Sequence, residues 1–203
     1  MDVTPDYHTA IAHLCAADPV LAEIIAAVGA CALQPTGHRF VTLADAIVSQ
    51  QLSVKAAATI MGRLVSALVE LTPAAILVAS DETLRAVGLS AQKARYLRDL
   101  AAHTLAGALD PLPGLDDEAA ITALTAIKGV GRWTAEIYLL FALGRPDVLP
   151  ADDLGLRHAV WQRYGLPAAP SSAAVRALAE PWRPHRSVAA WYLWRIRDRK
   201  GGA

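Results

Sequence analysis

One short stretch of this 203-residue sequence decides its fold, and it reads Ile127-Lys128-Gly129-Val130-Gly131-Arg132-Trp133-Thr134-Ala135. Two glycines flank one apolar residue, which predicts a hairpin too tight for any Cβ atom. Apolar residues at helical spacing lie on both sides, so a first helix ends at Ile127 and a second runs from Trp133 to Leu143. The first N–H groups of the second helix would then point outward, as an anion site requires. The stretch therefore predicts a helix–hairpin–helix that can grip a phosphate.

A Gly-x-Gly pattern alone is weak evidence, because many helical corners use glycine only to turn the chain. A dinucleotide-binding fingerprint is excluded, since it needs a preceding strand and a third glycine where this chain has Thr134. A hairpin of this kind contacts the DNA backbone rather than the base sequence. If Thr125, Ile127 and Val130 turn their carbonyl groups toward one point, they would also hold a monovalent cation beside the phosphate.

A pair of acidic residues follows the hairpin in the run Leu149-Pro150-Ala151-Asp152-Asp153. An acidic pair in a loop often caps the next helix. Negative charge is also favoured at a helix N-terminus, which suits a carboxylate that must face a developing cation. The capping role and the catalytic role both stay open, and one aspartate could be catalytic while the other caps the helix. Together with the hairpin, the pair suggests chemistry on DNA.

Composition narrows the class of protein without deciding it. The chain is 54% hydrophobic and carries 19 basic against 19 acidic residues, so any hold on nucleic acid must come from local charge and backbone dipoles. Cys15 and Cys31 lack any metal-ligand spacing and are predicted to be buried thiols. Neither a signal peptide nor an apolar run of about 18 residues is present, which predicts a cytoplasmic protein without a membrane partner.

Helical periodicity covers almost the whole sequence. Apolar residues recur at helical spacing in Leu43, Ile47, Val48 and Leu52, whereas alternation with a period of two is nearly absent. We therefore expect an all-α fold of about ten helices. Helix N-termini are predicted at Thr72-Pro73, Ser80, Asp116 and Ser171-Ser172.

These features resemble the helix–hairpin–helix (HhH-GPD) DNA glycosylase superfamily, and within it the alkylbase branch typified by DNA-3-methyladenine glycosylase II. The resemblance covers about residues 43–194 and is carried by Ser49–Ser53 with Ala56-Ala57, Gly88–Ser90 with Lys93-Ala94, Lys128–Ala135, Leu149–Asp153 and Trp182–Ser187. It implies a compact form without an N-terminal β domain. It also implies two helical lobes with a DNA-binding cleft between them. One lobe comprises residues 41–148 and carries the helix–hairpin–helix, and the other is formed by residues 1–40 and 149–203.

The resemblance assigns roles to individual residues. Asp153 matches the catalytic aspartate, because Leu154, Leu156 and Arg157 keep the family's spacing. The implied base pocket comprises Trp133, Trp194, Ile137 and Tyr138. The implied DNA-binding residues are Gln50, Gln51, Leu52, Ser53, Lys128, Gly129, Val130, Gly131, Arg132 and Thr134. Either Gln51 or Leu52 would enter the gap in the duplex, and the sequence leaves this choice open.

The resemblance also implies a reaction. Members that cut the DNA strand have a lysine nucleophile where this chain has Trp133, so the chain should be a monofunctional glycosylase. No cysteine lies beyond Cys31, so no iron–sulfur cluster is expected, and the only cofactor would be Na⁺ or K⁺ at the hairpin. The implied function is hydrolysis of the N-glycosidic bond of flipped-out alkylated purines, of the 3-methyladenine and 7-methylguanine type, by a monomer acting on double-stranded DNA in base excision repair. A non-catalytic helix–hairpin–helix DNA-binding module, or a glycosylase for another damaged purine, remains the alternative.

Overall fold

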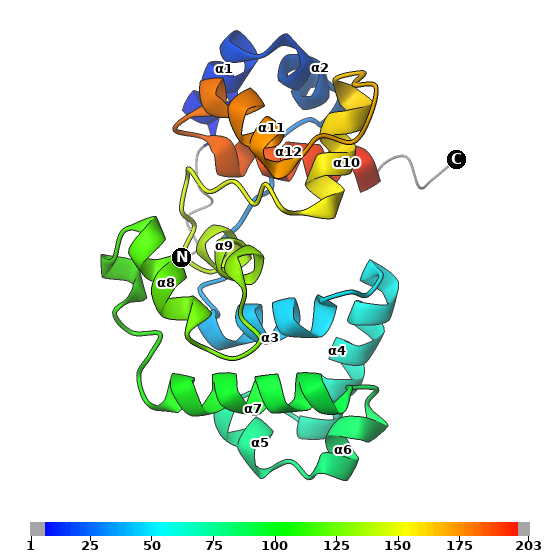
Figure 1. Cartoon of the computed structure of the whole chain (residues 1–203), viewed down its shortest axis with the longest axis vertical. Helices are drawn as coiled ribbons and strands as arrows, with labels where there is room; N and C mark the ends of the chain where they lie inside the picture. Colours follow the sequence, from blue (N-terminus) through cyan, green and yellow to red (C-terminus); the bar gives the residue numbers. More distant parts are fainter. Residues whose placement is uncertain (1–6, 199–203) are drawn as a thin grey trace. The chain divides into compact units, whose positions relative to one another are not determined.

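The computed structural model describes residues 7–198, and these form twelve α-helices and two 3₁₀ helices without a β-strand among them (Figure 1). The all-α expectation is therefore confirmed. None of the helices in this part of the chain is long and apolar enough to cross a membrane. The chain divides into two compact units, of which one is Thr36–Leu143 and the other joins the segment up to Pro35 with the segment from Gly144 onward.

The Thr36–Leu143 unit is built around α3, which packs against α4, α7 and α9. Leu43, Ile47 and Val48 of α3 are fully buried, as their helical spacing predicts. The shorter α5 and α6 pack on α7, and α8 packs on α9. The elements of this unit are α3 (Arg39–Ser49), α4 (Val54–Leu68), α5 (Pro73–Val78), α6 (Asp81–Ala86), α7 (Ala91–Leu105), η1 (Leu112–Gly114), α8 (Asp117–Thr125) and α9 (Arg132–Phe141).

Polar N-cap residues begin most of these helices where the sequence predicts them. The side chains of Thr72, Ser80 and Asp116 accept the N–H groups of Ala75, Thr83 and Ala119 at 3.1, 3.0 and 2.8 Å. Each bond satisfies a backbone donor that the first helical turn leaves unpaired and contributes about 1 kcal/mol to stability.

The second unit is formed by both ends of the chain around α12, which packs against α2 and α10. Asp18 is a buried carboxylate at its centre. Besides capping α2, it accepts hydrogen bonds from Trp182 Nε1 at 2.8 Å and from the Tyr164 hydroxyl at 2.7 Å. These bonds tie the first helices to segments about 150 residues later. The elements are α1 (His8–Ala17), α2 (Pro19–Val28), α10 (Leu154–Arg163), α11 (Ser172–Leu178), η2 (Glu180–Trp182) and α12 (Arg186–Asp198).

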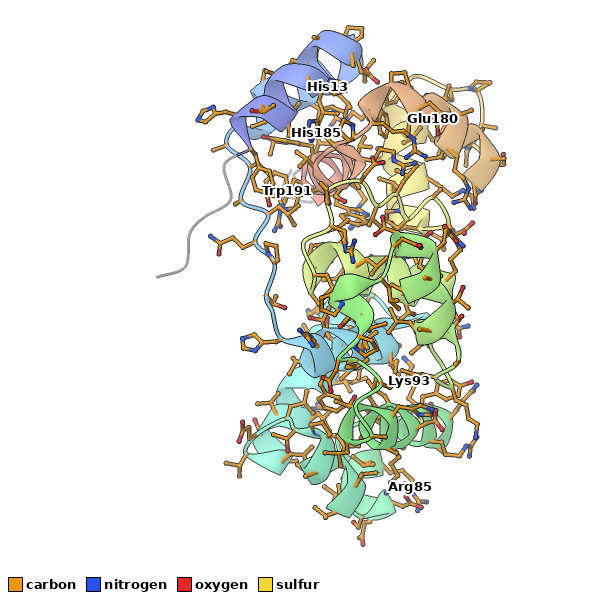
Figure 2. The ribbon with its side chains drawn as sticks, turned by 90° about the vertical axis from the view of Figure 1, so that its left-hand side faces the viewer. His13, Arg85, Lys93, Glu180, His185 and Trp191 are labelled. Carbon is orange, nitrogen blue, oxygen red and sulfur yellow. The ribbon has the colours of Figure 1, made fainter. Side chains whose placement is uncertain are left out.

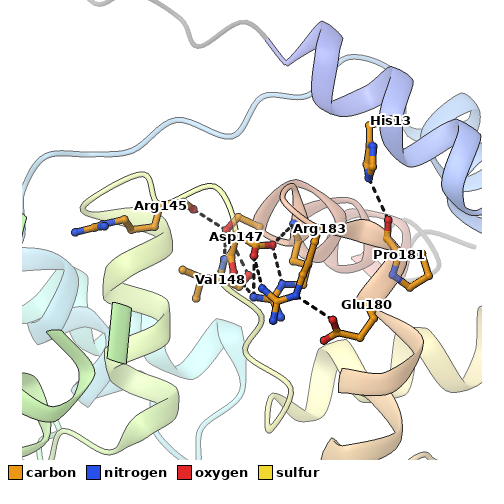
Figure 3. A network of polar contacts seen from close by, with 9 residues as sticks. His13, Arg145, Asp147, Val148, Glu180, Pro181 and Arg183 are labelled. Atoms are coloured by element: carbon orange, nitrogen blue, oxygen red, sulfur yellow. Dashed lines mark hydrogen bonds and ion pairs between the residues drawn. The ribbon is translucent and has the colours of Figure 1, made fainter. Parts of the chain in front are cut away.

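The boundaries of the units lie five residues before the predicted positions 40/41 and 148/149. At the first boundary, the Thr36 N–H donates to the carbonyl of Phe141 at 2.8 Å, which ties this residue to α9. At the second, the Asp147 carboxylate accepts from Arg186 Nε at 2.7 Å and from Arg183, and Ser187 Oγ donates to the Arg145 carbonyl at 2.6 Å (Figure 3). Side-chain bonds, which periodicity does not reveal, therefore assign residues 144–148 to the unit that contains α12.

Candidate functional site

The predicted hairpin is present between α8 and α9, and its two glycines have different roles. Gly129 has φ +85°, and a Cβ there would lie 2.3 Å from Cγ of Tyr96. Gly131 has φ −89°, and a Cβ there would meet no atom within 4 Å. The expectation that neither glycine tolerates a Cβ is therefore right for Gly129 and wrong for Gly131, because only Gly129 approaches α7. Gly131 caps α9 without a side-chain bond, which leaves the first turn of α9 uncovered.

The other hairpin residues contribute mainly backbone groups. Val130 and Thr134 are buried, so neither side chain is available to a ligand. Lys128 is exposed, and its N–H donates to Asp99 Oδ2 at 2.9 Å. Arg132 is held in ion pairs with Glu118 and Glu136, which raise the pKa of its guanidinium further above its ordinary value. Arg132 is therefore already paired and is not a free cation awaiting a phosphate.

The cation site on the carbonyl groups of Thr125, Ile127 and Val130 stays a prediction. The Ile127 carbonyl accepts the Val130 N–H at 3.0 Å, which closes the turn and leaves its second lone pair for a cation. The described residues contain no group of three or more His, Cys, Asp or Glu side chains that could hold a metal ion.

Gln50 connects the loop after α3 to the hairpin. Its side-chain Nε2 donates to the Gly129 carbonyl at 2.8 Å and to Thr134 Oγ1 at 3.2 Å. On the other side of the loop lies Lys93, whose place on α7 is labelled in Figure 2. Its Nζ donates to the carbonyl groups of Val48 and Gln50 at 2.6 and 2.7 Å. Partial burial lowers the pKa of Lys93. The two predicted DNA-binding segments are thus fixed to each other by a Gln50 side chain whose own backbone is held by Lys93.

The next three residues of this loop are exposed. Gln51 adopts φ +58°, an uncommon conformation for a residue with a side chain, and Leu52 is 40% exposed although it is apolar. Ser53 caps α4 by accepting the Ala56 N–H at 3.3 Å. Both candidates for insertion into the duplex are therefore accessible, and the choice between Gln51 and Leu52 stays open.

One face of α9 is partly open, and it carries aromatic and aliphatic side chains. Trp133, Ile137 and Phe141 are half-buried on successive turns, whereas residues 134–136 and 138–140 between them are buried. Tyr138, which we expected in the base pocket, is fully buried, and its hydroxyl has no hydrogen-bond partner among the described residues. Burial raises its pKa to about 12. Tyr138 is a core residue because neighbours in a helix point about 100° apart.

The acidic pair lies in the other unit, where its two members have different partners. Asp152 is exposed and pairs with Arg176 at 3.3 Å and with the Ser172 hydroxyl of α11. Asp153 is half-buried at the N-cap of α10, and its Oδ1 accepts the Leu156 N–H at 2.6 Å and Trp194 Nε1 at 2.9 Å. The structure therefore gives the capping role to Asp153, the same residue that the resemblance assigns to catalysis.

The absence of a side chain at Gly155 leaves space for the Arg197 guanidinium beside this carboxylate. A Cβ at Gly155 would lie 1.8 Å from a guanidinium nitrogen of Arg197 and 3.1 Å from Asp153 Oδ1. The guanidinium and the carboxylate therefore face the same small space over α10. The sequence does not reveal this arrangement, nor the contacts by which Gln50 and Lys93 hold the loop, because each depends on residues that are far apart in the chain.

Comparisons with known proteins agree with this description. Residues 44–184 match the model of the HhH-GPD superfamily of base excision DNA repair proteins. The alkylbase DNA glycosidase-like protein mag2 of Schizosaccharomyces pombe is 33% identical over 97% of this chain and 96% of its own length. DNA-3-methyladenine glycosylase 1 of the same yeast is 40% identical over 75% of this chain and 70% of its own length.

A solved structure is also similar. The chain superposes on Schizosaccharomyces pombe 3-methyladenine DNA glycosylase (Mag1), solved in complex with abasic DNA, with a TM-score of 0.85 and 35% identity. The match covers 94% of this chain and 97% of that one. With a helix–hairpin–helix and a following aspartate in place, the family expected from the sequence is confirmed, and this chain belongs to the HhH-GPD superfamily of base excision DNA repair proteins.

Proposed function

We propose that the protein is a monofunctional DNA glycosylase that releases alkylated purines, of the 3-methyladenine and 7-methylguanine type, from double-stranded DNA, and that it acts as a monomer. The single observation that carries the proposal is the placement of Asp153, whose carboxylate is oriented by Leu156 N–H and Trp194 Nε1 at the start of α10. The names of the relatives, 3-methyladenine glycosylases and an alkylbase glycosidase-like protein, support the same substrate class.

The proposed binding of DNA uses backbone groups of the hairpin. The uncovered N-terminus of α9 presents N–H groups and the positive end of the helix dipole to a phosphate. The exposed loop residues Gln51 and Leu52 supply the side chain that fills the space left by the flipped nucleotide. Because Gln50 fixes this loop to the hairpin, the position of the inserted side chain depends on the position of the hairpin on the phosphate.

The proposed chemistry needs little from the enzyme. A purine alkylated at N3 or N7 is cationic and leaves as a neutral base, so no general acid is required. The C1′–N bond breaks with its electron pair moving to the base, and water then adds to C1′ and loses a proton. The Asp153 carboxylate stabilises the oxocarbenium-like sugar and orients that water. Trp133, in place of a lysine nucleophile, allows hydrolysis but no Schiff base.

The test is base release from duplex DNA methylated with a simple alkylating agent. We expect the purified protein to release 3-methyladenine and 7-methylguanine and to leave intact abasic strands. One observation favours a second candidate, a DNA-binding protein without glycosylase activity, since Asp153 already has a structural role as a helix cap. Binding to abasic DNA without any release of methylated bases would establish that second function.

Replacing Trp133 by alanine should slow excision of 7-methylguanine about 2- to 30-fold, because cation–π stacking on an indole contributes about 0.5–2 kcal/mol. The single-turnover rate is the measurement, and Trp133→Phe, which keeps an aromatic face, should retain most of it. An unchanged rate in the alanine variant would exclude stacking at this position.

A further inference from the structure

A pocket of about 460 Å³ lies beside α9 within the Thr36–Leu143 unit. It is lined by residues of α3 and of the segment before it, by Met61 of α4, and by Ile137 and Phe141 of α9. Ile137 and Phe141 belong to the half-open face of α9 that begins with Trp133. The pocket therefore extends the surface on which we place the extruded base, and its volume falls in the range of small-molecule sites.

Asp45 of α3 is the one acidic side chain that lines this pocket. Its neighbours satisfy one another, because Thr36 Oγ1 and Thr42 Oγ1 share a hydrogen bond of 3.1 Å and the His38 N–H donates to Thr36 Oγ1 at 3.2 Å. Asp45 itself has neither a hydrogen bond nor an ion pair with any residue in the range 7–198. The pocket thus contains a carboxylate whose acceptors remain available to a ligand.

The surroundings of Asp45 disfavour a lone negative charge. Its side chain is exposed at the wall of the pocket, but the protein around it is dense enough that burial raises the pKa of the carboxyl group. A ligand that brings a positive charge or N–H donors into the pocket would relieve this cost. A neutral apolar ligand would not.

We propose that Asp45 is a specificity residue that selects positively charged purines by receiving the cationic, amino-bearing edge of the alkylated base in this pocket. The inference rests on the proposed function and adds to it the reason for the substrate class. The aromatic and aliphatic side chains of α9 contact the faces of the base, and Asp45 contacts its edge. An uncharged purine without an N–H donor, such as 1,N6-ethenoadenine, gains nothing from the carboxylate.

The test compares single-turnover release of 7-methylguanine and 1,N6-ethenoadenine from otherwise identical duplexes. Asp45→Asn keeps the shape of the side chain and removes its charge, so release of 7-methylguanine should become about tenfold slower, as expected for a hydrogen bond to a charged group. Release of 1,N6-ethenoadenine, which has neither a positive charge nor an N–H donor, should stay within about twofold of its wild-type rate. Glu70→Gln removes an exposed charge of the same unit outside the pocket and should change neither rate.

A second measurement does not depend on glycosylase activity. Wild-type protein should bind the cationic nucleoside 1-methyladenosine more tightly than adenosine in an NMR titration, and Asp45→Asn should abolish that preference. The inference is overturned if the variant keeps the wild-type preference, or if it loses both release rates equally. A wild-type protein that releases no methylated base but shows the Asp45-dependent preference would contradict the proposed function and not the assignment of Asp45.

Discussion

Replacing Asp153 by asparagine should lower release of 3-methyladenine from methylated DNA by at least about 10²- to 10³-fold, the effect expected when a preorganised charge is removed from a developing transition state. The substitution is a clean one, because asparagine is as good an N-cap as aspartate. Its Oδ1 can still accept the Leu156 N–H and Trp194 Nε1, so the start of α10 should keep its structure. Single-turnover release, with thermal unfolding measured in parallel, checks both parts of this expectation.

Asp152→Asn is the matched control for this substitution. Asp152 is exposed and pairs with Arg176 and Ser172 of the same unit, so its charge contributes little to stability. Its release rate should stay near that of the wild type. Binding to abasic DNA should survive in both variants, since the hairpin is unchanged. Comparable losses in the two variants would show that Asp153 matters only through the general negative charge of the loop.

Replacing Gly129 by alanine should destabilise the Thr36–Leu143 unit by roughly 3 kcal/mol and weaken binding of abasic duplex DNA at least about tenfold. Two effects add up here. The φ of +85° is unfavourable for any residue with a Cβ, and that Cβ would lie 2.3 Å from the Tyr96 ring. Urea unfolding measures the first consequence and fluorescence anisotropy with labelled DNA the second.

Two further variants separate these effects. Gly131→Ala should cost less than about 1 kcal/mol, the order of an N-cap substitution, because its backbone angles are ordinary and its Cβ would meet nothing within 4 Å. In the double variant Gly129→Ala, Tyr96→Ala, the stability lost through the clash with the ring should be recovered. The loss that comes from the positive φ of residue 129 should remain. A Gly129→Ala protein with unchanged stability would show that the hairpin is not as tight as described.

The helices could be predicted from sequence because their signals are local. Thr72, Ser80, Asp116 and Ser171 each cap a helix by accepting an N–H three residues ahead, a distance over which the sequence is a direct guide. The hairpin was equally visible, since Gly129 serves a local turn. Even so, the true reason for glycine at this position is the Tyr96 ring, which is 33 residues away in the chain.

The polar contacts of the candidate site could not be predicted in the same way. Gln50 meets the hairpin across 79 residues, and Trp194 meets Asp153 across 41. Periodicity says which face of a helix is buried, but not which partner it finds. The placement of Tyr138 shows the limit even at short range, because adjacency to Ile137 in the chain put it on the wrong face of α9.

The assembly of one unit from both ends of the chain has a consequence during synthesis. The continuous segment 36–143 can fold as soon as it leaves the ribosome, whereas α1 and α2 must wait for α12. At about 5–20 residues translated per second, their apolar faces stay open for roughly 10–30 seconds, and Asp18 stays without Tyr164 and Trp182. Nascent chains of this protein should therefore bind holdase chaperones through the region of α1 and α2 until translation has passed α12.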